Sequence, residues 1–449
     1  MRSAFRSQQP LLLAYGSHPR ARELAALDQL IEHNPELVEL VAKGLLTRPK
    51  VSNEVGRPGM SGEQILRFGI VRVLEACTFD DLEFLLSDSV SYRRFCRIGF
   101  GEKGPSASAL QENLRGVESD AWKSINDAVV RMAKELGVEG GKKVRVDCTV
   151  TESNIHPPDD AAQLFDVVRV LQRLLRKAEK LRTGIRVHSR TKRAKRRRLE
   201  ILNKTDDERK AAYRDLLRVA DEMLGWSRAA VGLLRAGAQP DDPASRLAET
   251  IENFVGLGER VINQTRRRVI DGEKVPAQEK VLSVFEPHTD IIIKDRREVL
   301  YGHKLLIATG ASGLVFHIEV LKGNPADSTL VGPALDSVES ALGSMPEQAA
   351  FDGGFASREG LALAKEKGVK DVCFSKRRGM AIADMARSTK VYRALWRFRA
   401  GVEAGISLLK RCFGLDRCHW KGEDGFHAYV QSSVVAFNLV LLARALTPG

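Results

Sequence analysis

Three acidic residues stand beside apolar segments, where burying a charge is costly. Asp147 lies in the alternating, β-branched stretch 142–151, Asp352 follows the apolar stretch 348–351, and Glu403 borders an apolar stripe on a predicted helix. A buried carboxylate needs a partner or a cation. Clustered carboxylates repel one another, and hard divalent cations such as Mg²⁺ or Mn²⁺ relieve that repulsion by binding their oxygens. Two such ions about 4 Å apart can activate a water or a 3′-hydroxyl and stabilise the leaving oxygen in phosphodiester chemistry.

Glu403 shares one face of its predicted helix with residues suited to nucleic acid. At about 100° per residue, Trp396, Arg399, Glu403 and Lys410 fall within an arc of roughly 60°. Taken alone, this pattern is typical of an amphipathic helix in which Arg399 and Glu403 form a surface ion pair. With two aspartates on predicted strands elsewhere in the chain, we expect Glu403 to be a third metal ligand.

The composition indicates a polyanionic partner. The net charge is +13 and the isoelectric point is near 9.5, which favours nucleic acid, with an anionic membrane surface as the weaker alternative. The apolar run 434–442 is too short to span a bilayer, and residues 1–13 lack the apolar core of a signal peptide. The six cysteines form no C-x-x-C pair, which suits a reduced cytosolic interior. We therefore expect a cytoplasmic protein that binds no membrane.

A second positively charged region lies in the stretch 186–198, which contains no acid. Such a run is either a solvated helix face or a track for DNA phosphates. In a chain this basic we expect the track. The residues expected to contact DNA there are Arg190, Lys192, Arg193, Lys195, Arg196, Arg197 and Arg198.

The predicted elements indicate three domains. Residues 1–140 are predicted to be helical, with Ser61 capping one helix, and their interleaved arginines and aromatics suit a DNA-binding unit or a plain helical bundle. Residues 141–160 and 276–449 are predicted to form a mixed α/β domain, in which 281–285 is one of the strands. A basic helical insertion is expected over 161–275.

Several blocks of the sequence jointly resemble a known family. Arg399-x3-Glu403-x6-Lys410 matches part of the Tyr-x2-Arg-x3-Glu-x6-Lys signature of DDE transposases from bacterial insertion sequences, and Trp396 stands where the tyrosine is expected. Further blocks that resemble this family are 105–115, 146–157, 301–304, 323–327 and 352–357. The chain is thus similar to the IS4/IS5-like superfamily, nearest its ISNCY-type members.

The resemblance implies a fold and a set of site residues. It implies an RNase H-like core, interrupted by the helical insertion and preceded by the helical N-terminal domain. Asp147, Asp352 and Glu403 would hold two Mg²⁺ (or Mn²⁺) ions. Arg399 and Lys410 would contact phosphates of the terminal strand, and Trp396 would stack on a base or a sugar. The implied partners are double-stranded DNA, as terminal inverted repeats and as target, and a second copy of the chain in a homodimer on DNA.

The leading hypothesis is therefore a DNA transposase that cuts the ends of its element and joins them to target DNA by metal-dependent phosphoryl transfer. Two alternatives stay open at this point. One is a DNA-binding protein whose catalytic centre has decayed, although the presence of all three acids argues against decay. The other is a metal-dependent nuclease without strand transfer. Asp290 and Asp327 fit turn positions better than ligand positions.

Overall fold

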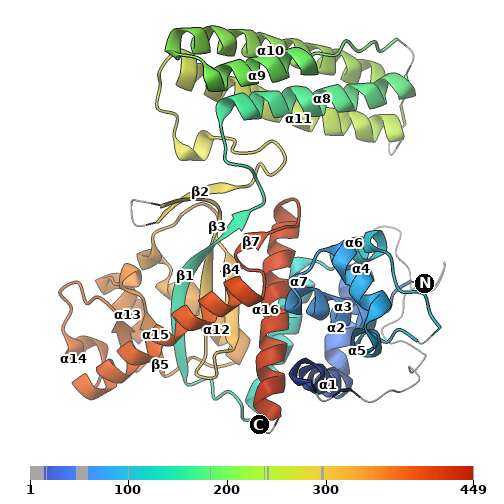
Figure 1. The fold of residues 1–449 in the computed structure, drawn as a ribbon. Helices are drawn as coiled ribbons and strands as arrows, with labels where there is room; N and C mark the ends of the chain where they lie inside the picture. Colours follow the sequence, from blue (N-terminus) through green and yellow to red (C-terminus); the bar gives the residue numbers. More distant parts are fainter. Residues whose placement is uncertain are drawn as a thin grey trace. The chain divides into compact units, whose positions relative to one another are not determined.

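The computed structural model divides the chain into two compact units. The first joins Met1–Asn154 to Gly302–Gly449, and the second is Ile155–Tyr301 (Figure 1). The residues that the structure describes are 15–16, 18–46, 59–99, 101–182, 184–236, 238–239, 242–294 and 298–447. The prediction about a leader segment falls on residues 1–13, which lie outside the described residues.

The first unit begins with helices that share one hydrophobic core with the sheet that follows. Ser61 caps the third helix as predicted, because its hydroxyl accepts the N–H of Gln64 while the Gln64 side chain accepts the N–H of Ser61. Arg67 of the same helix is fully buried, with Nη1 2.7 Å from Asp28 Oδ1 and Nη2 3.0 Å from Glu63 Oε1. The helices are α1 (Pro19–Glu32), α2 (Pro35–Leu46), α3 (Gly62–Leu74), α4 (Phe79–Asp88), α5 (Val90–Phe95), α6 (Ala107–Leu114) and α7 (Ser119–Glu135).

A mixed sheet forms the centre of the first unit, in the strand order β4-β3-β1-β5-β6. On one side of β1, β3 runs antiparallel to β1 and β4 runs antiparallel to β3, whereas β5 and β6 run parallel to β1 on the other side. The short strand β7 pairs with the end of β1, and β2, whose residues belong to the second unit, pairs with β3. The strands are β1 (Lys143–Ser153), β2 (Asp290–Lys294), β3 (Glu298–Thr309), β4 (Val315–Val320), β5 (Gln348–Phe351), β6 (Asp371–Phe374) and β7 (Arg417–Cys418). The mixed α/β class is therefore confirmed.

The strand predicted over 281–285 is wrong. This segment is irregular, and Val281 and Val284 pack into the helical core of the second unit. The side chain of Gln264 takes the place of a neighbouring strand, because it accepts the N–H of Val281 and donates to its carbonyl. The apolar pattern thus reflected burial against helices.

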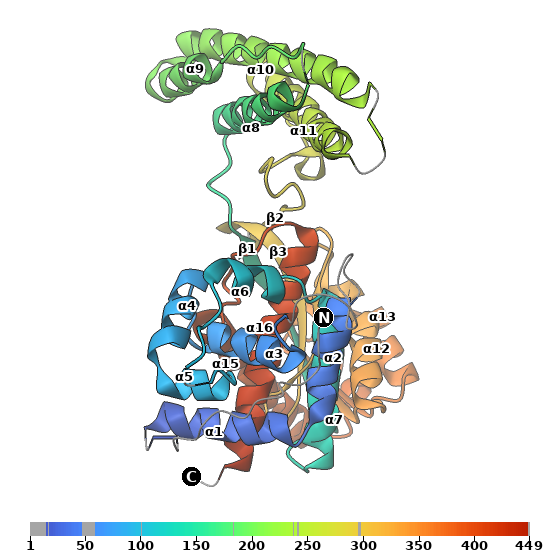
Figure 2. The same ribbon diagram turned by 90° about the vertical axis from the view of Figure 1, so that its right-hand side faces the viewer.

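Helices cover the sheet, and the last one runs between the sheet and the N-terminal helices (Figures 1 and 2). This helix, α16, is long and apolar enough by length and composition to cross a membrane, yet 89% of its most apolar 18-residue stretch is buried in the fold. It is a core helix, and it does not mark a membrane protein. The covering elements are η3 (Asp327–Thr329), α12 (Val331–Leu342), η4 (Gly353–Phe355), α13 (Arg358–Glu366), α14 (Ile382–Met385), α15 (Thr389–Cys412) and α16 (Glu423–Leu446).

The second unit is a bundle of helices with a hydrophobic core of its own. Four long helices make up the bundle, and it ends in two short turns. The elements are α8 (Asp160–Leu181), α9 (Thr191–Asn203), α10 (Asp206–Arg235), α11 (Pro243–Thr265), η1 (Arg266–Ile270) and η2 (Ala277–Glu279). The bundle enters the chain between β1 and β3, at the place expected for the insertion; the three-domain division itself stays a prediction.

Candidate active site

The register of two parallel strands brings the two aspartates together. Val146 of β1 pairs with Phe351 of β5, and each aspartate is the next residue along its chain. Asp147 lies within β1 rather than at its end, with 16% of its side chain exposed, whereas Asp352 directly follows β5. Asp147 and Asp352, which are far apart in the sequence, are therefore neighbours at the C-terminal end of β5.

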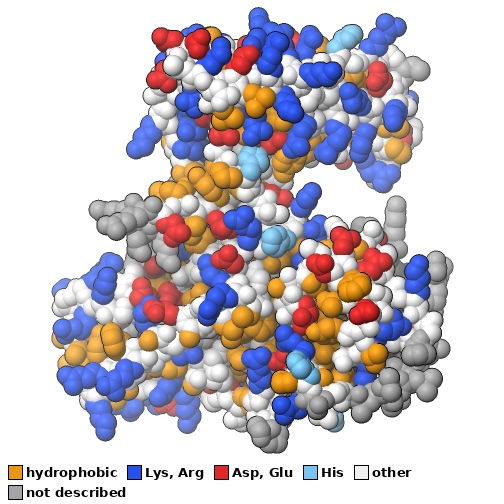
Figure 3. All heavy atoms as spheres, viewed as in Figure 1, with side chains coloured by type: hydrophobic (Ala, Val, Ile, Leu, Met, Phe, Trp, Pro, Cys, Tyr) orange, Lys and Arg blue, Asp and Glu red, His pale blue; other side chains and the backbone are white. Residues whose placement is uncertain are grey.

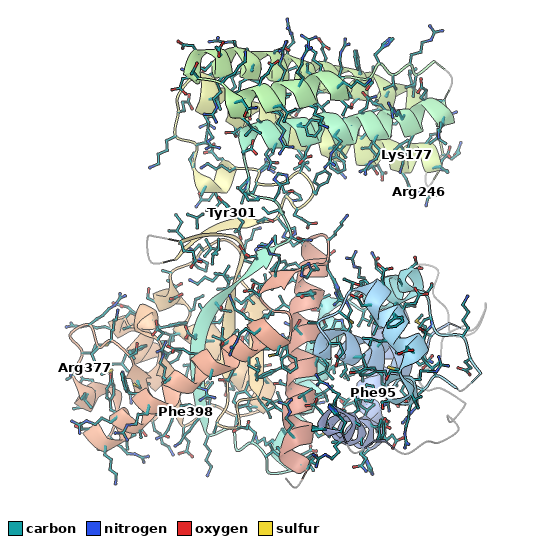
Figure 4. The ribbon with its side chains drawn as sticks, viewed as in Figure 1. Phe95, Lys177, Arg246, Tyr301, Arg377 and Phe398 are labelled. Carbon is teal, nitrogen blue, oxygen red and sulfur yellow. The ribbon has the colours of Figure 1, made fainter. Side chains whose placement is uncertain are left out.

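Glu403 reaches the same place because α15 is fixed against the sheet. The Arg145 guanidinium of β1 donates to the Phe398 carbonyl at 3.1 Å and lies 4.8 Å from the centre of the Phe398 ring, which Figure 4 labels. A Cβ on Gly401 would lie 2.0 Å from Nη1 of Arg145, so only glycine permits this close approach. Nearer the start of α15, the Tyr392 hydroxyl donates to the Phe374 carbonyl at 2.6 Å.

One guanidinium joins all three acids. Nη2 of Arg399 lies 2.8 Å from Asp352 Oδ1 and 3.4 Å from Asp147 Oδ2, and Nη1 lies 2.8 Å from Glu403 Oε1. The side chain of Arg399 is 17% exposed, whereas that of Glu403 is 63% exposed. The ion pair expected between Arg399 and Glu403 exists, and it belongs to a cluster of three carboxylates around one cation.

The two aspartates have opposite pKa shifts. Burial, together with the negative charges of Asp352 and Asp327, raises the pKa of Asp147 to about 6, against the hydrogen bond from the Cys148 N–H and the charge of Arg399. Burial acts in the same direction on Asp352. Hydrogen bonds from the Gly353 N–H and the Ser375 hydroxyl, with Arg399, outweigh it and lower the pKa of Asp352.

A fourth acid, Asp327, lies beside this cluster, where the sequence indicated only a turn. Its Oδ1 is 2.6 Å from Nζ of Lys304, a buried residue of β3 that also donates to the Pro325 carbonyl. A Cβ on Gly354 would lie 2.4 Å from Asp327 Oδ2, so Asp327 packs against the turn that follows Asp352. The resemblance of the block 323–327 to the family pointed to Asp327, but the position of this block in the sequence did not show which strand end Asp327 approaches.

The donor set fits a hard divalent cation, because carboxylate oxygens are the ligands that Mg²⁺ and Mn²⁺ prefer. Within the described residues, however, no three acid, histidine or cysteine side chains are grouped so as to hold an ion. The acids meet at the Arg399 guanidinium instead. Metal binding therefore requires this guanidinium to give up at least part of its contacts.

Trp396 and Lys410 lie on the same helix as the cluster but do not contact its acids. Trp396 is 52% exposed, and Nζ of Lys410 is 3.7 Å from Asp416 Oδ1. Lys410 lies seven positions after Glu403, or about 10 Å further along the helix axis.

The basic run of the second unit divides into inward and outward residues. Arg193 and Arg197 bind Asp215 of α10, each with a closest contact of 2.5 Å, and Nε of Arg190 is 2.9 Å from Glu222 Oε2. Arg198 lies over the ring of Phe165 in the same bundle, with 5.6 Å between its guanidinium carbon and the ring centre. Lys192, Lys195 and Arg196 are exposed, and Arg196 is only loosely paired, with Nε 3.9 Å from Glu200 Oε1.

Two family models match the chain. Residues 262–439 match a transposase DDE domain, and residues 14–115 match a transposase domain (DUF772). The chain is a DDE transposase of the insertion-sequence type. As a transposase it is an enzyme of DNA cleavage and transfer that acts on DNA, and its family uses divalent metal ions. The DDE match includes Asp352 and Glu403 but begins after Asp147. No curated protein and no solved structure matches the chain.

Proposed function

We propose that this transposase cleaves the ends of its own insertion sequence and joins them to target DNA, with Asp147, Asp352 and Glu403 as ligands of two Mg²⁺ (or Mn²⁺) ions. The observation that carries the proposal is the convergence of the three acids, from β1, from the end of β5 and from α15, on the single guanidinium of Arg399. Three carboxylates and one guanidinium leave a net charge of about −2 when all are ionised, which a divalent cation would neutralise.

The proposed catalytic core is RNase H-like. In support, β3 lies antiparallel to β1 on one side, with β4 beside it, and β5 and β6 lie parallel to β1 on the other side. Such a sheet places residues that follow β5 beside residues of β1. The proposed subfamily is the IS4/IS5-like group of ISNCY type, on the sequence blocks that resemble it.

The metal ions, when bound, would supply Lewis-acid activation of the attacking oxygen and stabilise the leaving oxygen. The chain's own residues hold and orient the DNA. Arg399 is the counter-ion that keeps the three carboxylates together, and its planar fork suits a bidentate contact with a phosphate once those contacts loosen. Lys410 would place a point charge beside a phosphate of the same DNA strand. The exposed indole of Trp396 offers a surface on which a base or sugar stacks.

Further parts of the proposal concern partners and location. The DNA partners are the terminal inverted repeats and the target duplex, the active form is a homodimer on DNA, and the protein works in the cytoplasm. The exposed cations Lys192, Lys195 and Arg196 of α9 are proposed to contact phosphates, together with Arg190, Arg193, Arg197 and Arg198 where DNA draws them from their partners within the bundle.

The test uses Glu403→Gln, which removes one negative charge and keeps the size of the side chain. With a duplex that carries an element end and Mg²⁺ present, we expect cleavage to be lost while the duplex is still bound at nearly wild-type affinity. Cleavage at the wild-type rate in this variant would refute the assignment of Glu403. Short inverted repeats in the DNA that flanks the coding region would identify the substrate for this assay. Joining of the released 3′-hydroxyl to new DNA distinguishes a transposase reaction from hydrolysis alone.

A further inference from the structure

A second set of cations lies in the first unit, close to the acidic cluster but not part of it. The segment 376–399 contains eight Lys or Arg residues and a single acid, Asp384. Two of these cations are paired, because Arg399 binds the acidic cluster and Nη2 of Arg387 lies 3.4 Å from Asp371 Oδ2. The other six are exposed, and none forms an ion pair within the described part of the chain. We call them the α14–α15 basic surface: Lys376, Arg377, Arg378, Lys390, Arg393 and Arg397.

One half of this surface is a loop held beside Asp352. Ser375, which begins the loop, donates its hydroxyl to Asp352 Oδ1 at 2.9 Å and its N–H to the Phe351 carbonyl at 3.1 Å. The next side chain, Lys376, packs over Gly353, where a Cβ would lie 2.8 Å from its Cγ. Arg378 then adopts a φ of +47°. The loop therefore begins beside Asp352 and carries three successive exposed cations.

The other half is a stripe on α15. Lys390, Arg393 and Arg397 fall within an arc of roughly 60° and extend over about 10 Å of helix axis. Phosphates of one DNA strand rise by about 3.4 Å per nucleotide, so the stripe matches about three consecutive phosphates. Figure 3 shows Lys and Arg side chains gathered over the part of the unit where Figure 1 places α14 and the beginning of α15, and Figure 4 labels Arg377 there.

The basic stripe lies on a different face of α15 from Trp396, Arg399, Glu403 and Lys410, which share one face of the same helix. The centres of the two faces are about 120° apart around the axis of α15. Strand transfer requires two DNA segments to meet at one set of acids: the element end that carries the 3′-hydroxyl, and the duplex that it attacks. Two stripes on a single helix that also carries Glu403 suit two segments held at the same time.

The composition of the surface indicates which segment it binds. All six residues of the surface are Lys or Arg, side chains that commonly contact DNA phosphates. Contacts from Lys and Arg to phosphates position a duplex without reading its sequence. The ends of an element must be recognised by sequence, whereas a target duplex can be gripped through its backbone.

We propose that the α14–α15 basic surface binds the phosphate backbone of target DNA during strand transfer. This inference rests on the proposed function, because it assumes that Asp147, Asp352 and Glu403 form the catalytic centre. It assigns target capture to one face of α15 and to the loop after β6, and it leaves the element end to the face that carries Trp396, Arg399 and Lys410.

The test separates cleavage from transfer. The stripe variant is Lys390→Ala with Arg393→Ala and Arg397→Ala, since alanine favours the helix. The control removes the same charge from three exposed lysines on other segments, as Lys103→Ala with Lys322→Ala and Lys421→Ala. A loop variant is Arg377→Ala with Arg378→Asn, because asparagine tolerates a positive φ.

With Mg²⁺ present, we expect the stripe variant to cleave element ends within about twofold of wild type. Joining of a pre-cleaved end to a plasmid should fall about tenfold or more, because three phosphate contacts are lost. The loop variant should show a smaller loss of joining, and the control variant none. Equal losses of cleavage and joining would assign the surface to the element end, and unchanged joining would make it a solvated face; either result overturns the proposal.

A binding measurement keeps the test independent of catalysis. A fluorescent duplex of random sequence is titrated without metal at several salt concentrations. For the stripe variant, the slope of log affinity against log salt concentration should become shallower by about 2.7, at about 0.9 for each lost phosphate contact. An unchanged slope would refute phosphate binding by this surface, even if the wild-type enzyme joined no DNA. Failure of the proposed function is seen differently, as cleavage that persists in Glu403→Gln.

Discussion

Two clusters of opposite composition govern the two units. In the first unit one arginine, Arg399, joins three carboxylates. In the second unit one carboxylate, Asp215, joins three arginines, which are Arg193, Arg197 and Arg218. The first cluster leaves negative charge unbalanced and the second leaves positive charge unbalanced. The first cluster therefore carries a net negative charge, whereas the second holds α9 against α10 through ion pairs.

A dense run of basic residues in the sequence does not predict which cations are unpaired in the folded protein. The run at 190–198 looks like a continuous track, yet Arg190, Arg193 and Arg197 bind acids of α10. The cations of the α14–α15 basic surface come from a three-residue run in a loop and from spaced positions on α15, and they form no ion pair in the described part of the chain. The distribution of acids on neighbouring elements decides the difference.

The largest expected effect compares the central arginine of the first cluster with an arginine of the second. Arg399→Ala should lower the rate of end cleavage on the order of 10² to 10³-fold, the usual loss when one charge-stabilising donor is removed from an active site. Arg218→Ala should leave that rate within about twofold, since its ion pair is with Asp215 within the bundle. Single-turnover cleavage of an end duplex measures both. Similar rates in the two variants would remove the functional distinction between the clusters.

The next effect concerns stability and pH in the first cluster. The folded-state pKa of Asp147 is raised from 3.8 to about 6, so the folded protein is favoured by this group at low pH, and the advantage is lost as pH rises through 6. Asp147→Asn should therefore raise the free energy of unfolding above pH 6, by up to about 3 kcal/mol at about 1.4 kcal/mol per pKa unit. The gain should shrink toward zero near pH 4.

Chemical denaturation in EDTA at several pH values measures this gain. Hydrogen exchange of β1 reports specifically on the first unit, since a chain of two units need not unfold in one step. A pH-independent difference between Asp147→Asn and wild type would show that the change acts through packing rather than through ionisation.

Metal binding tests whether the acids of the first cluster act together. Mg²⁺ or Mn²⁺ at about 100 times its dissociation constant should stabilise the wild-type first unit by about 2.7 kcal/mol per bound ion. Asp352→Asn should lose most of this stabilisation. Arg399→Ala should bind the ion more tightly in the absence of DNA, because the competing guanidinium is gone. Isothermal titration with each variant measures the affinities, and a weaker affinity in Arg399→Ala would contradict this competition.

The smallest effect is the opposite pH dependence in the second cluster. Hydrogen bonds from Arg193, Arg197 and Arg218 hold the pKa of Asp215 well below its usual range. Asp215 thus contributes stability that is present above the unfolded pKa near 4 and is lost as pH falls through the lower folded value. Asp215→Asn should destabilise the bundle by about 1–2 kcal/mol at pH 7, since the three arginines are partly exposed to solvent. Hydrogen exchange of α9 and α10 at pH 7 and pH 3 checks the value and its direction.

Much of the local structure followed from the sequence. Ser61 with Gln64 predicted the start of α3, and the alternation around Asp147 predicted β1, because caps and periodicity are local properties. The segment 281–285 was misread because an apolar run does not reveal whether a strand or a helix covers it. Asp327 lies in the short turn η3 as expected, but its approach to Gly354 could not be predicted because it depends on where β3 places Lys304.

By itself the sequence determined the family, the acids worth testing and the helix on which Glu403 lies, because residue identity and spacing are enough for these. The tertiary structure alone decided that Asp147 and Asp352 are neighbours, since only the pairing of Val146 with Phe351 joins them. It also decided that Arg399 meets all three acids, and that Arg193 and Arg197 turn inward to Asp215. Charges interact over a few ångströms, and those distances are set by how strands and helices pack.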